Sequence, residues 1–74
     1  MNDNNLSDEL INALTMKYRS EIQSALATLR IYLKNPVGIG EHPQHLEEMD
    51  KLVETMASNN DKLESLKRHF NIAP

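Results

Sequence analysis

The sequence contains no cysteine and no tryptophan, and only Tyr18, Tyr32 and Phe70 of its 74 residues are aromatic. The lack of cysteine excludes disulfides and thiolate metal sites. A core of leucine, isoleucine, valine, methionine and alanine favours helices, so we expect an all-α fold. The length allows one small domain and excludes a separate cofactor domain. Domains this small usually need a disulfide, a metal or a partner chain to stabilise their core.

Basic residues are also few: eight lysines and arginines stand against eleven aspartates and glutamates, a net charge of −3. This balance argues against a dedicated nucleic-acid-binding protein, because such proteins neutralise phosphates with basic side chains. No apolar run approaches the roughly 20 residues that span a bilayer, so we expect no membrane contact. The polar opening, Met1–Asn5, lacks the basic and apolar regions of a secretory signal. We therefore expect a cytoplasmic protein.

The first half of the chain predicts one long helix. Residues 1–6 are expected to form a disordered tail and residues 7–34 a helix, with Ser7 as its N-cap. Pro36 disfavours helical backbone at the preceding residue, which ends the helix by Lys34. Apolar residues recur with a period of about 3.7, typical of an almost straight helix: Ile11, Leu14, Tyr18, Ile22, Ala25, Leu29 and Leu33.

The second half predicts a second helix of similar length. Residues 35–42 contain both glycines of the chain and are expected to form a loop. Pro43 suits the first position of a helix over residues 43–71. Two matched helices joined by a short loop predict an antiparallel hairpin, with basic residues late in the first helix near acidic residues early in the second. Its expected core comprises Leu14, Ile22, Leu29, Met49, Val53, Met56 and Leu63.

Residues 58–61 leave an alternative open. Ser58 and Asp61 stand at capping-box spacing, so the second helix could end here and a third begin, which would give a three-helix bundle. We favour the hairpin because the apolar pattern continues through Asn60 and no glycine or proline interrupts it. Asn60 would then occupy a core position and help to fix the register of the helices.

Several apolar residues fall beside the single seam that two helices can bury. A wide apolar stripe on an isolated hairpin would attract a partner, and a second copy would complete a four-helix bundle. We therefore expect a homodimer. The loop is a second place where binding residues often lie. The candidate interaction residues on helices and loop are Leu10, Ile31, Tyr32, Val37, Ile39, Leu52 and Leu66.

Histidines suggest the one candidate metal site. With a helix beginning at Pro43, His45 and Glu48 lie one turn apart, and His42 precedes them. The chain has no Glu-x-x-His pair, which the di-iron bundles use. We therefore expect no metal, no cofactor and no catalytic residue, and interpret these side chains as solvated or capping. A metal-binding, ferritin-like bundle remains an alternative.

The segment Tyr32–Pro43, with the acidic second helix that carries Asp61–Glu64, resembles small uncharacterised helical proteins of tailed bacteriophages that infect marine bacteria. The resemblance covers mainly residues 32–50. It implies a virus-encoded protein that acts inside an infected bacterium, and it brings no catalytic residue with it. The sequence as a whole predicts a non-enzymatic interaction protein that contacts a host or viral protein. A regulator of host transcription or nucleic-acid metabolism is the alternative.

Overall fold

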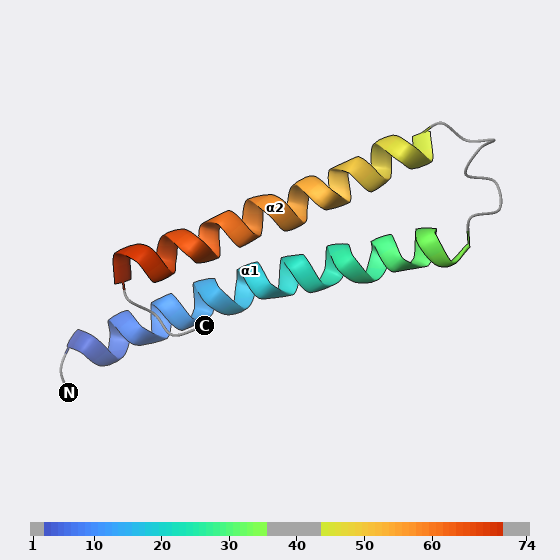
Figure 1. Ribbon diagram of the computed structural model, residues 1–74. Helices are drawn as coiled ribbons and strands as arrows, with labels where there is room; N and C mark the ends of the chain where they lie inside the picture. Colours follow the sequence, from blue (N-terminus) through green and yellow to red (C-terminus); the bar gives the residue numbers. More distant parts are fainter. Residues whose placement is uncertain (1–2, 36–43, 71–74) are drawn as a thin grey trace.

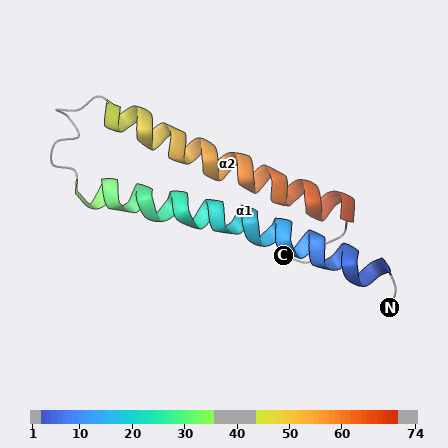
Figure 2. The same ribbon diagram turned by 180° about the vertical axis from the view of Figure 1, so that it is seen from behind.

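Two long helices make up the part of the chain that the structure, a computed structural model, describes: residues 3–35 and 44–70, with side chains from Leu6 onwards. Helix α1 spans Asp3–Lys34 and helix α2 spans Gln44–Phe70. They run antiparallel and lie side by side in both views of the molecule, which measures 58 × 18 × 16 Å (Figures 1 and 2). The expected all-α helical hairpin is confirmed.

The helix boundaries differ from the expectation at one end. Helix α1 begins at Asp3, four residues before the expected cap, so Ser7 lies inside the helix with an exposed side chain. No glycine or proline stands between these positions, so nothing in the backbone prevents the earlier start. Helix α2 continues without a break through residues 58–61. The three-helix alternative is therefore wrong.

Side-chain contacts between the two helices define the register of the hairpin. Near the connection, the Tyr32 hydroxyl donates a hydrogen bond to Oε2 of Glu48 at 3.1 Å. The ring of Tyr32 also lies 5.5 Å from that of His45, centroid to centroid. About four turns farther from the connection, Nζ of Lys62 lies 5.4 Å from the ring centroid of Tyr18. Tyr32 and Tyr18 are separated by 14 residues, as are Glu48 and Lys62, so the two helices keep one register along their length.

The buried seam follows an alternating spacing of four and three residues, as in antiparallel coiled coils. Its members are all buried or half-buried. On α1 they are Ile11, Thr15, Tyr18, Ile22, Ala25, Leu29 and Tyr32; on α2 they are His45, Met49, Leu52, Met56, Asn59, Leu63 and Leu66.

This seam corrects part of the expected core. Leu14 and Val53 are exposed, and Asn60 is exposed whereas its neighbour Asn59 is only 6% exposed. The expected period of 3.7 describes a straight helix, but two helices that stay in contact follow a period near 3.5. On α1 this difference rotates the buried stripe by about 40° in each heptad, which places different residues in the seam. On α2 the expected Val53 and Asn60 each stand directly after the seam residue, Leu52 or Asn59.

Candidate interaction surface

Many apolar side chains remain exposed beside the seam. Among the described residues Ala25, at 4% exposed, is the only buried hydrophobic residue, and no large side chain is fully buried. A hairpin of two helices can cover only one stripe on each, so the rest of the apolar surface faces solvent. The exposed large hydrophobic residues are Leu6, Leu10, Leu14, Met16, Ile31, Leu33, Leu46, Val53 and Phe70.

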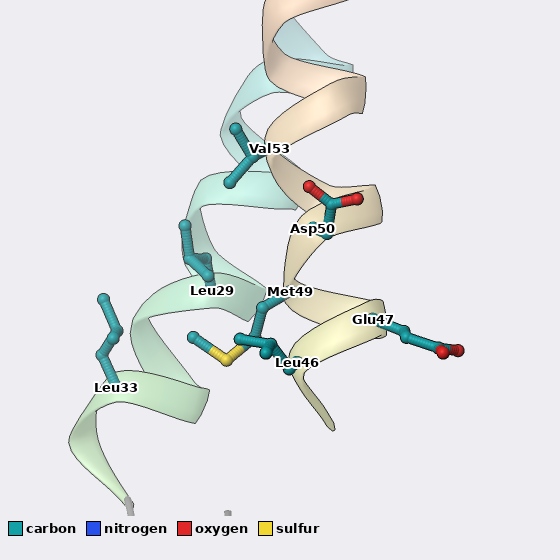
Figure 3. A pocket seen from close by; sticks show the side chains of 7 residues that line it. All are labelled: Leu29, Leu33, Leu46, Glu47, Met49, Asp50 and Val53. Carbon is teal, nitrogen blue, oxygen red and sulfur yellow. The ribbon is translucent and has the colours of Figure 1, made fainter. Parts of the chain in front are cut away.

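Part of this apolar surface forms a groove between the helices. The groove has a volume of about 610 Å³ and lies in the half of the hairpin nearest to residues 35 and 44. Figure 3 shows aliphatic side chains from α1 and α2 gathered along one side of the helix pair, with Asp50 and Glu47 at the edge of α2. The lining residues are Leu29, Leu33, Leu46, Glu47, Met49, Asp50 and Val53.

The two edges of the groove carry opposite charges. On α2, Asp50 stands four residues after Leu46 and three before Val53, so it borders both. On α1, Arg30 occupies the same position between Leu26 and Leu33. Both charged side chains are exposed. The groove is thus an apolar strip with a basic edge on one helix and an acidic edge on the other.

Farther from the connection, the positions equivalent to Leu33, Leu46 and Val53 become polar. Seven residues before Leu26 the corresponding position of α1 is Arg19, and seven residues after Val53 the corresponding position of α2 is Asn60. The next such position on α2 is Lys67, which forms an ion pair with Glu64 at 3.6 Å. The apolar groove therefore ends near the middle of the hairpin.

The opposite side of the seam carries polar contacts. Glu48, seven residues before Thr55 and fourteen before Lys62, accepts the Tyr32 hydrogen bond there. This hydrogen bond raises the pKa of Tyr32 above its usual value, and burial and the negative charge of Glu48 act in the same direction. Lys62 covers the Tyr18 ring on the same side. On α2 this side of the seam is therefore polar, whereas α1 exposes Leu10, Leu14 and Ile31 there.

Within the seam, Asn59 is the one buried polar residue among those described. Its Nδ2 donates a hydrogen bond to the backbone oxygen of Thr55 at 2.8 Å, one turn earlier in α2. A buried amide at such a position lowers stability and favours one register, the role expected of Asn60.

The residues proposed from sequence for interaction are dispersed. Leu10 and Ile31 are exposed but do not line the groove, whereas Tyr32, Leu52 and Leu66 are half-buried in the seam. Val37, Ile39 and His42 lie outside the described residues. Sequence reasoning missed the groove residues Leu33, Leu46 and Val53 as a surface, because it placed Leu33 and Val53 in the buried pattern of the helices and did not include Leu46 among the interaction residues. The available signal was that each of them directly follows a residue of the seam pattern, which leaves an apolar side chain beside the seam.

The candidate metal ligands have other contacts. His45 packs against the Tyr32 ring, and Glu48 accepts the Tyr32 hydroxyl hydrogen bond. Over residues 3–35 and 44–70, no group of three histidine, aspartate or glutamate side chains is arranged to hold a metal ion.

Neither described helix is apolar enough over a sufficient length to cross a membrane. Comparisons with protein-family models, curated proteins and solved structures find no match to this chain.

Proposed function

We propose that this chain is a non-enzymatic interaction protein that acts through helix–helix contacts and associates as a homodimer into a four-helix bundle. One observation carries the proposal: the hairpin exposes nine large hydrophobic side chains and buries a single small one among its described residues. Apolar surface of this extent, gathered partly into a groove, is typical of a protein-binding surface.

The surface area of the chain supports the same conclusion. Its accessible surface is 5966 Å², whereas a compact monomer of 8.5 kDa exposes about 4,700 Å². The radius of gyration is 16.6 Å, against about 11 Å for a compact domain of this length. The excess of roughly 1,300 Å² exceeds the roughly 800 Å² that each partner buries in a standard protein interface.

The resemblance of residues 32–50 to phage proteins supports a virus-encoded protein working in the cytoplasm of an infected bacterium. The target there would be a host or viral protein rather than nucleic acid, because the net charge is −3.

Light scattering and sedimentation velocity at 1–100 μM test the proposal. We expect a particle of about 17 kDa, twice the chain mass of 8.5 kDa. Its helical circular dichroism should fall on dilution, because the folded state and the dimer are coupled. A stably folded monomer of 8.5 kDa across this range would contradict self-association. Purification of the tagged chain from infected cells then identifies any further partner.

A further inference from the structure

We propose that a second copy of this chain covers the groove. The two copies are related by a two-fold axis parallel to the helices, so the ends at which α1 connects to α2 lie together at one end of the bundle. This arrangement rests on the self-association proposed above and specifies its surface and direction. Helix α1 of each copy then lies over α2 of the other, so that all neighbouring helices are antiparallel.

The position of the apolar strip restricts how two copies can meet. On the groove side, the positions directly beside the seam are apolar only in the half nearest the connection: Leu33, Leu46 and Val53 line the groove, and the half-buried Leu26 stands seven residues before Leu33. The other half presents Arg19, Asn60 and Lys67 at the equivalent positions. A two-fold contact is self-complementary. The strip of one copy must therefore lie on the same strip of the other.

Two symmetric arrangements satisfy this requirement. With the axis parallel to the helices, both connecting ends lie together and α1 faces the partner's α2. With the axis across the helices, the connecting ends point in opposite directions, α1 faces the partner's α1 and α2 faces the partner's α2. The edges of the groove decide between them.

Arg30 and Asp50 lie at the same level along the hairpin. Arg30 precedes Tyr32 by two residues, Asp50 follows Glu48 by two, and Tyr32 is hydrogen-bonded to Glu48. Rotation about an axis parallel to the helices keeps each residue at its level. Arg30 of each copy therefore meets the partner's Asp50, which forms two favourable pairs. The crossed arrangement, in which the axis runs across the helices, instead brings the two basic edges together and the two acidic edges together, which is repulsive.

Charge reversal tests this pairing by analytical ultracentrifugation at low salt, where such pairs are least screened. We expect Arg30→Asp to weaken dimerisation about 10- to 100-fold, because two attractive pairs become repulsive. The combined variant Arg30→Asp/Asp50→Arg should dimerise within about threefold of the original chain. The matched control is Lys51→Asp, which makes the same change of charge at an exposed position that does not line the groove. Circular dichroism checks that each variant remains helical.

Mixing distinguishes the two arrangements. The combined variant and the original chain are mixed, and native mass spectrometry counts the mixed and unmixed dimers. In our arrangement, both charge pairs of a mixed dimer consist of like charges. Mixed dimers should therefore fall well below the statistical half. The crossed arrangement makes both pairs attractive in a mixed dimer, so mixed dimers at or above half would overturn our assignment. A monomeric original chain would instead contradict the proposed self-association itself.

Discussion

Truncation of Leu33 to alanine gives a direct measure of the groove's contribution to dimerisation. Leu33 lines the groove and is 61% exposed in the hairpin. Ile31 stands two residues away, is 62% exposed and does not line the groove. Residues two apart in a helix point in different directions. Ile31→Ala is therefore a matched control of nearly equal exposure.

The size of the effect follows from the exposed fraction. Complete burial of a leucine side chain stabilises by about 1.5–3 kcal/mol, so burying the exposed three-fifths of Leu33 contributes about 1–2 kcal/mol in each copy. Alanine retains part of this contact. The two copies together should therefore lose about 2–3 kcal/mol, which raises the dimer dissociation constant roughly 30- to 150-fold. Ile31→Ala should change it less than threefold, because this side chain stays in solvent.

Sedimentation equilibrium at several concentrations measures both dissociation constants. Alanine favours helix more than either original residue, so neither substitution should reduce the helicity of the monomer. The reasoning is refuted if Leu33→Ala and Ile31→Ala weaken the dimer equally, or if only Ile31→Ala does so. Either result would place the interface on another face of α1.

Two further predictions concern the hairpin itself. Asn59→Leu should raise the free energy of unfolding, measured by urea titration, by about 1–2 kcal/mol, because it replaces a buried amide in the seam with an apolar side chain. The control Ser58→Leu, at an exposed neighbouring position, should change it by less than about 0.5 kcal/mol. Because the pKa of Tyr32 is raised in the folded state, its contribution to stability should be complete below the ordinary tyrosine pKa near 10 and decline as pH rises through the folded value. In a Tyr18→Phe background, ultraviolet titration should show Tyr32 ionising at a lower pH after Glu48→Ala, and an unchanged titration would mean that this hydrogen bond does not raise the pKa.

The sequence was sufficient to predict two helices and their antiparallel direction. Both glycines lie in one short stretch, and Pro36 and Pro43 bracket it, so the connection could be placed without a structure. The absence of glycine and proline around Asn60 correctly indicated that α2 continues through residues 58–61. These features depend on the backbone preferences of neighbouring residues, which a single sequence contains.

The assignment of residues to the seam was less accurate. Asn59 and Asn60 are adjacent and chemically identical, so residue type cannot distinguish which is buried. Leu14 fits the apolar series of period 3.7 in the first helix and Val53 was expected in the core of the second, yet both are exposed. A straight-helix pattern and a coiled-coil pattern coincide over one or two turns and separate over eight. The accumulated rotation is what the sequence pattern left undetermined.

The sequence by itself determined the helical class, the position of the connection and the excess of apolar residues over what one seam can bury. These properties follow from local backbone preference and composition. Only the tertiary structure decided which apolar residues the seam covers and which remain in the groove beside Leu33 and Val53. It also decided that Arg30 and Asp50 lie at one level on opposite edges of that groove. Both outcomes depend on how two helices rotate and slide to pack their side chains together, which is a property of the pair.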